Sequence, residues 1–273
     1  MPADPAGRRA GKASTTVSIA LLYPELLGTY GDGGNAAVLA QRLRWRGLPA
    51  EVVTVLAGQA VPETCDLYLM GGGEDGPQAL AAAQLASSGA LARAVDSGAA
   101  VLAVCAGFQV IGHTFTGPDG EGHPGLGLLD CDTRRGAGPR RVGEILVDAG
   151  ARDLGELTGY ENHAGVTSLG SGAEALGTVV VGRGNDSGDG REGAVSGRVV
   201  GTYLHGPVLA RNPRLADLLL SWVVGPLDPL PVDEAEVEEE VEALRDERRA
   251  AARRPAVGEA RSWVRTWVSR LRS

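Results

Sequence analysis

Short apolar runs alternate with helical sequence over the first 115 residues, and this alternation restricts the fold more than any other feature. The runs lie at 17–23, 51–56, 67–70 and 99–104. Segments 36–46, 77–97 and 108–115, between and after these runs, have the residue pattern of helices. Strands separated by helices pair in parallel, and a parallel sheet is covered by helices on both faces. The sequence therefore predicts an α/β fold with three layers and a mainly parallel sheet.

Later in the chain, the predicted strands follow one another with no helix between them. They are expected at 128–133, 142–147, 179–182 and 194–201. Direct connections of this kind favour antiparallel additions to the sheet. A polar loop is predicted at 159–165 and a helix at 213–222.

Three segments differ in composition. Residues 1–16 are rich in Ala, Gly, Pro and Arg and predict a disordered N-terminus, whereas residues 17–225 carry all the strand and helix patterns of one domain. Residues 226–273 predict a charged, helical tail. Apolar residues at 261–271 share one helix face, which would pack on the domain or on a partner, or else touch a membrane surface.

Charge and cysteine usage exclude several classes of protein. The net charge of −8 argues against a nucleic-acid partner, which would require a basic face. The three cysteines are odd in number and widely spaced, so the sequence predicts neither a disulfide framework nor a metal site. No apolar run approaches the ~18 residues of a membrane span. These features predict a cytoplasmic protein.

The strongest chemical signal is Cys105, which ends a buried strand and precedes a helix in the sequence Ala-Val-Cys-Ala-Gly. A nucleophile elbow has this pattern of small neighbours, because its sharp turn crowds the backbone. The turn places the sulfur at a helix N-terminus, where the thiolate is favoured, and directs the Ala106 N–H toward a developing oxyanion. Cys65 and Cys131 lack this context and are expected to be buried structural residues.

Two further segments complete the candidate site. Gly71, Gly72 and Gly73 follow a predicted strand, and their N–H groups could complete an oxyanion hole with Ala106. His205 ends the last strand, and strand ends on one edge of a parallel sheet meet at the ligand crevice. His205 is therefore preferred as the base over His163, which remains the alternative.

Together these motifs resemble the class I glutamine amidotransferases, whose flavodoxin-like three-layer fold the chain is expected to adopt. The cobyric-acid-synthase-like branch fits best, and within it the family of GatD subunits, the glutaminase subunits of lipid II isoglutaminyl synthase. The resemblance covers 17–222 and rests on Leu22–Leu27, Tyr30–Asn35, Trp45–Gly47, Gly71–Asp75, Cys105–Gln109, Gly125–Gly127, Arg140 with Gly143–Ile145, and Tyr160–His163.

The resemblance implies a mechanism in which Cys105 attacks the side-chain amide of L-glutamine. Amides near Gly72, Gly73 and Ala106 would hold the oxyanion, while His205 would protonate the leaving ammonia and then activate water. Arg140 is the candidate for binding the glutamine carboxylate, although its neighbour Arg141 stays open. No cofactor is expected in this chain.

The same resemblance implies a heterodimer. A ligase resembling MurT would use ATP and Mg²⁺ to activate the D-glutamate α-carboxylate of lipid II, and ammonia would convert it to D-isoglutamine at the inner face of the membrane. One residue departs from the class: Pro207 stands where many class I glutaminases place a glutamate, two residues after the histidine. The site would then be a Cys–His dyad or would take a carboxylate from elsewhere, and the GatD resemblance favours one from the partner.

Two other classes of function remain open. One is a cobyric-acid-type amidotransferase or another small-molecule cysteine hydrolase, although no nucleotide-binding P-loop motif is present. The other is a non-catalytic binding module that keeps the nucleophile-elbow turn without its activity. The presence of both Cys105 and His205 disfavours this alternative.

Overall fold

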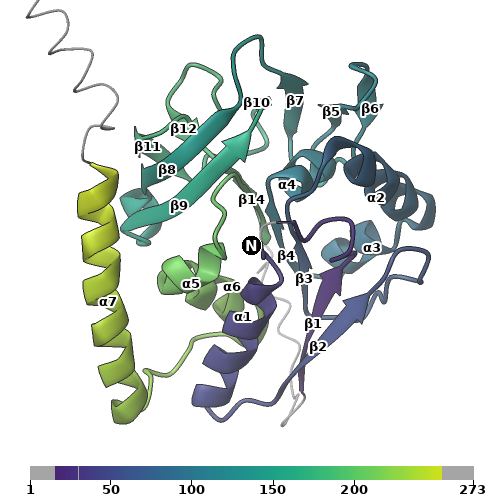
Figure 1. Cartoon of the computed structure of the whole chain (residues 1–273). Coiled ribbons are helices and arrows are strands. Elements are labelled where there is room, and N and C mark those ends of the chain that lie inside the picture. The colour runs from purple at the N-terminus through teal and green to yellow at the C-terminus, as the bar shows by residue number, and fades with distance from the viewer. Residues whose placement is uncertain (1–15, 30, 254–273) are drawn as a thin grey trace, which may run out of the picture.

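The computed structural model describes residues 16–29 and 31–253, and its centre is a six-stranded sheet (Figure 1). The strand order is β13-β14-β4-β3-β1-β2. The strands are β1 (Val17–Leu22), β2 (Ala50–Val55), β3 (Leu67–Met70), β4 (Ala100–Val104), β13 (Ala194–Ser196) and β14 (Val199–Thr202). All neighbours pair in parallel except β13, which is the antiparallel edge strand. The order β2-β1-β3-β4-β14 is that of flavodoxin-like sheets, which confirms the predicted fold class.

Helices cover both faces of this sheet. They are α1 (Gly34–Trp45), α2 (Asp75–Ser88), α3 (Ala90–Asp96), α4 (Ala106–Ile111), α5 (Val208–Arg211) and α6 (Pro213–Val224). Figure 1 shows α1, α5 and α6 on one face and α2 and α3 on the other. Every residue of β3 and β4 is buried, as expected for central strands between two helical layers. The single helix predicted at 77–97 is divided at Gly89, whose φ of 60° favours glycine.

Two four-stranded sheets lie above the central sheet in Figure 1. One contains β5 (Thr114–Thr116), β6 (Gly122–Pro124), β7 (Cys131–Arg135) and β10 (Gly165–Leu169), and the other β8 (Arg141–Asp148), β9 (Glu156–His163), β11 (Gly177–Val181) and β12 (Arg191–Glu192). The predicted loop at 159–165 is wrong, because most of it belongs to β9. Its polar residues Glu161 and His163 point into the protein, so the strand shows no alternation of apolar and polar residues.

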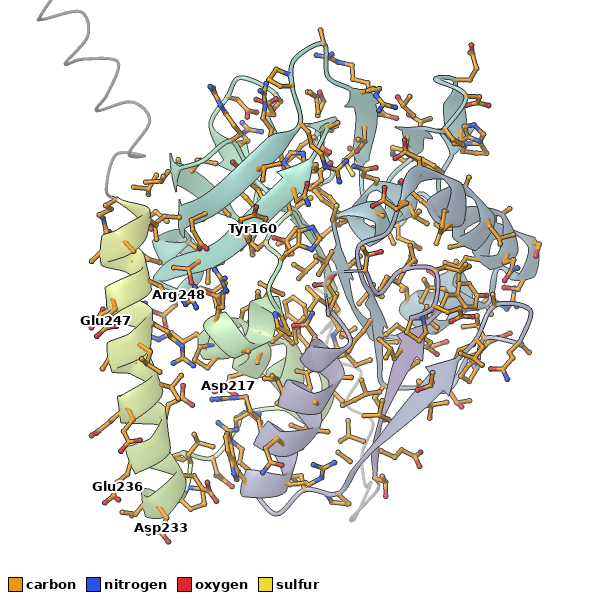
Figure 2. The ribbon with its side chains drawn as sticks, viewed as in Figure 1. Tyr160, Asp217, Asp233, Glu236, Glu247 and Arg248 are labelled. Atoms are coloured by element: carbon orange, nitrogen blue, oxygen red, sulfur yellow. The ribbon has the colours of Figure 1, made fainter. Side chains whose placement is uncertain are left out.

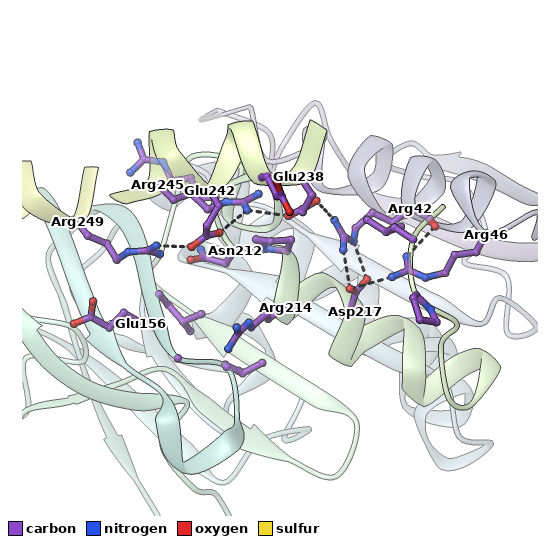
Figure 3. Close-up of a pocket in the computed structure, with 18 residues that line it drawn as sticks. Arg42, Arg46, Glu156, Asn212, Arg214, Asp217, Glu238, Glu242, Arg245 and Arg249 are labelled. Carbon is purple, nitrogen blue, oxygen red and sulfur yellow. Dashed lines mark hydrogen bonds and ion pairs between the residues drawn. The ribbon is translucent and has the colours of Figure 1, made fainter. Parts of the chain in front are cut away.

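The first part of the tail forms helix α7 (Val232–Ala252), and Glu238, Arg248 and Arg253 form ion pairs between this segment and the domain. Arg42 on α1 is buried, and its guanidinium binds both carboxylate oxygens of Asp217 on α6 at 2.7 Å and Glu238 on α7 at 2.9 Å (Figure 3). Arg245, also buried, binds Glu238 from within α7. Helix α7 therefore packs on its own domain. The amphipathic segment 261–271 lies outside the described residues.

Replacing Asp217 by alanine should lower the free energy of unfolding by about 2 kcal/mol. The change removes the carboxylate that binds the buried Arg42 guanidinium through both oxygens. Among the described residues, only Glu238 then remains as a carboxylate partner that compensates the positive charge of Arg42. Urea denaturation followed by circular dichroism measures this loss. The matched control is Glu247→Ala on the exposed side of α7 (Figure 2). Equal midpoints for the two variants would show that the Arg42 ion pairs do not hold the domain together.

Within the described part of the chain, no helix is both long enough and apolar enough to cross a membrane.

Candidate active site

Four loops meet at one edge of the central sheet because four neighbouring parallel strands end there. Asp32 follows β1, Gly71–Gly73 follow β3, Cys105 follows β4, and His205 follows β14. Carboxyl ends of parallel strands form the usual ligand crevice of such sheets. The strand order therefore brings together residues that are up to 173 positions apart in sequence.

Cys105 occupies the elbow that the sequence predicts. Its φ of 52° and ψ of −105° lie outside the regions that non-glycine residues usually adopt, a strain that occurs mostly at functional sites. The turn leaves no room beside it: a Cβ on Gly107 would lie 2.8 Å from the Met70 Cβ. Gly107 also donates its N–H to the Gly71 carbonyl, which joins the elbow to the glycine loop.

The His205 side chain is buried beside Cys105, close enough for the two groups to interact electrostatically. Its backbone is fixed by β9, where the Tyr160 carbonyl accepts from the His205 N–H at 3.0 Å and the Tyr160 N–H donates in return at 3.2 Å. Burial alone lowers the pKa of His205, but hydrogen bonds with Asp32 and Cys105 outweigh it and raise that pKa to about 9. The imidazole is thus held in its protonated form at neutral pH.

Asp32 is a residue of this site that the sequence patterns do not indicate. Its Oδ2 lies 3.3 Å from the Nδ1 of His205, and both side chains are almost completely buried. Pro207, at the position of the expected glutamate, has no group that could take this place. The sequence signal for Asp32 is weak, because it is only an aspartate among glycines after the first strand. It indicates a site residue only once β1 is known to lie beside β3.

The predicted oxyanion amides do not all face the thiol. Gly72 donates its N–H to Asp32 Oδ2 at 2.8 Å, so this amide is directed at the carboxylate. Gly73 and Ala106 both line the small cavity beside Cys105. Of the three predicted donors, these two therefore lie beside the thiol, whereas the Gly72 amide is taken up by Asp32.

Arg140 and Asn162 cover the thiol. The Arg140 guanidinium donates to both the side-chain oxygen and the carbonyl of Asn162, and that carbonyl lies 3.9 Å from the Cys105 Sγ. The cavity that Arg140 lines with Cys105 has a volume of only about 40 Å³. Arg141 instead pairs with Asp186 at 2.7 Å, which makes Arg140 the arginine beside the thiol.

His163 lines the same cavity but is poorly suited to act as the base. Its ring stacks on Tyr203 with centroids 3.7 Å apart, and its Nδ1–H donates to the Gly165 carbonyl. Burial lowers the pKa of His163 to about 4. His113 and His123 pair with aspartates at the surface.

The two other cysteines are buried, and neither lines the cavity beside Cys105. Burial raises the pKa of Cys65, and it raises that of Cys131 to about 12. Both thiols are therefore protonated and poorly nucleophilic at neutral pH, in agreement with the structural role expected for them.

A second cavity, of about 750 Å³, lies between α7 and the domain (Figure 3). Paired arginines and carboxylates line it, and none of the residues at the thiol does. In the part of the chain that the structure describes, no group of three or more His, Cys, Asp or Glu side chains could hold a metal ion.

A flavodoxin-like sheet with a cysteine elbow and a histidine on adjacent strand ends is the arrangement of a glutamine amidotransferase. Residues 18–213 match the CobB/CobQ-like glutamine amidotransferase domain, and the chain belongs to this family. Family and site together define a glutaminase, an enzyme that releases ammonia from the side-chain amide of glutamine.

Two relatives carry the name lipid II isoglutaminyl synthase (glutamine-hydrolyzing) subunit GatD. The protein from Staphylococcus aureus (strain N315) is 35% identical over 219 residues, which are 78% of this chain and 88% of the relative. The protein from Streptococcus pneumoniae (strain ATCC BAA-255 / R6) is 34% identical over 208 residues, 75% of this chain and 79% of the relative.

Other similarities are shorter or more distant. A probable cobyric acid synthase from Methanoregula boonei is 41% identical over 145 residues, but these are 47% of this chain and 26% of that protein. A crystal structure of a glutamine amidotransferase, 22% identical, superimposes with a TM-score of 0.53 over 75% of this chain and 98% of its own, and so shares the fold.

Proposed function

We propose that this chain is the glutaminase subunit of a lipid II isoglutaminyl synthase. The observation that carries the proposal is that Cys105, at its elbow after β4, and His205, after the neighbouring strand β14, lie at one edge of the sheet. The choice between a GatD subunit and a cobyric acid synthase follows from the share of each relative's length that this chain matches. The two GatD relatives match over 79% or more of their length, whereas the cobyric acid synthase matches over 26%.

The first half of the reaction begins with the Cys105 thiolate, which attacks the side-chain amide carbon of L-glutamine. The N–H groups of Gly73 and Ala106 stabilise the oxyanion. His205, held as an imidazolium, donates its proton to the amide nitrogen, so that the C–N bond breaks, ammonia leaves, and a thioester remains on the sulfur.

In the second half, the neutral His205 takes a proton from water as the water oxygen attacks the thioester. Collapse of this second tetrahedral intermediate releases glutamate and restores the thiolate and the imidazolium. Glutamine and water become glutamate and ammonia, and no cofactor takes part. Arg140 binds the α-carboxylate of glutamine, because its guanidinium already reaches over the thiol and exchanges Asn162 for the substrate.

The ammonia is used by a partner. A MurT-like ligase activates the D-glutamate α-carboxylate of lipid II with ATP and Mg²⁺, and amidation yields D-isoglutamine. Because lipid II is made at the inner face of the membrane, the complex works in the cytoplasm at that face.

The test is to co-purify this chain with a MurT-like ligase and to measure lipid II amidation. The wild-type complex should amidate lipid II with glutamine as the nitrogen source. A complex that carries Cys105→Ser should do so only when ammonium chloride replaces glutamine. A wild-type complex that releases no ammonia from glutamine, or that amidates a corrinoid acid and not lipid II, contradicts the proposal.

A further inference from the structure

We propose that Asp32 is the positioning residue of the catalytic histidine and takes the place of the acid that Pro207 cannot supply. Its carboxylate orients the His205 ring and also fixes the glycine loop that carries the oxyanion amide. The proposal rests on the proposed function and goes beyond it, because it places the third polar member of the site in this chain rather than in a partner.

The geometry ties two catalytic elements to one carboxylate. Asp32 Oδ2 accepts the Gly72 N–H at 2.8 Å and lies 3.3 Å from His205 Nδ1. The Asp32 and His205 side chains are only 1% and 2% exposed, so water cannot replace either contact. The close packing extends to Gly71, where a Cβ would lie 2.9 Å from the Asp32 Cβ.

A purely structural role would not require a charge at this position. Asparagine could accept the Gly72 N–H equally well through its carbonyl oxygen. A buried carboxylate is costly unless charged or hydrogen-bonded partners compensate it, and the group placed to do so is the protonated His205 ring. The charge is therefore explained by the histidine rather than by the glycine loop.

The contact also decides which ring nitrogen meets the thiol. The two nitrogens of an imidazole point in different directions, so a ring whose Nδ1–H is directed at Asp32 presents Nε2 on its other side. Cys105 also interacts with the His205 side chain, which gives the order carboxylate, imidazole, sulfur. This is the arrangement of a catalytic triad, in which the acid holds the tautomer and stabilises the imidazolium.

The experiment compares Asp32→Asn with wild-type full-length chain in ammonia release from glutamine between pH 5 and pH 10. The asparagine keeps the acceptor for Gly72 and removes the charge beside His205. We expect kcat to fall by about 10²-fold or more with little change in KM. The high-pH limb of kcat/KM, which reports loss of the His205 proton, should move to lower pH by about one unit. The matched control, Asp66→Asn, removes an aspartate that binds Ser18 far from the site and should keep the wild-type profile.

A second measurement does not depend on turnover. Histidine NMR should show His205 of the wild-type chain titrating near pH 9, with a proton on Nδ1, and titrating lower in Asp32→Asn. A wild-type His205 that titrates at or below about 6.5 overturns the inference even if the variant does not fold. An unchanged pH profile in a folded Asp32→Asn variant overturns it as well.

The two measurements separate the inference from the proposed function. If the wild-type chain, alone and with its ligase, releases no ammonia from glutamine, the proposed function fails. The NMR titration then still decides whether Asp32 holds the His205 proton.

Discussion

Replacing Cys105 by serine should reduce ammonia release from glutamine by about 10⁴-fold or more. A serine hydroxyl at the same elbow is far less acidic than a thiol, so it is a much weaker nucleophile for the proposed attack on the amide. The fold should be unaffected, because serine is nearly isosteric with cysteine. An enzyme-coupled assay for ammonia, with thermal melting to confirm folding, measures the loss.

The matched control is Cys65→Ser. Cys65 is a buried cysteine just before β3, and burial raises the pKa of its thiol. This variant should retain wild-type activity. A diazoketone analogue of glutamine should label Cys105 and leave Cys65 and Cys131 unmodified, as peptide mass mapping would show. A Cys105→Ser variant with more than a tenth of the wild-type rate would show that another group is the nucleophile.

Replacing His205 by alanine should reduce kcat/KM by about 10³-fold or more, because the variant loses the group proposed to protonate the leaving amide nitrogen. The wild-type enzyme should lose activity as the pH rises through about 9, where the raised pKa of His205 places the loss of its proton. The alanine variant should lack this limb. Rates measured from pH 5 to pH 10 test both statements.

His113→Ala is the control for this substitution. His113 is an exposed histidine paired with Asp130, and its removal should leave both the rate and the pH profile unchanged. If His205→Ala kept the high-pH limb near pH 9, the titrating group would have to be a different residue, and the assignment of His205 as the acid and base would be wrong.

Short stretches of sequence were enough to predict the features that neighbouring residues in the chain determine. Cys105 was identifiable because the strand, the small residues and the helix that form its elbow lie within a few neighbouring positions. His205 was identifiable because it closely follows the last predicted strand of the sheet. The parallel sheet followed from the alternation of strands and helices, since that alternation admits few other connections.

Strand β9 shows why part of the fold was missed. It carries Glu161 and His163 on its buried side, where Glu161 accepts the N–H groups of Arg183 and Gly184. Buried polar residues satisfied by distant backbone groups look like loop residues in sequence. The strand nevertheless fixes the backbone of His205 through Tyr160, so the base is held in place by a segment predicted as a loop.

The sequence by itself indicated the family and the type of sheet, and it singled out Cys105 and His205 as the candidate nucleophile and base, because each signal lies in residues close together in the chain. Only the tertiary structure decided that Arg140 rather than Arg141 lies over the thiol, and that Asp32, 173 positions away, meets His205. The physical reason is that the order of strands in a sheet is set by packing across the whole domain. That order decides which strand ends, and therefore which side chains, share one edge.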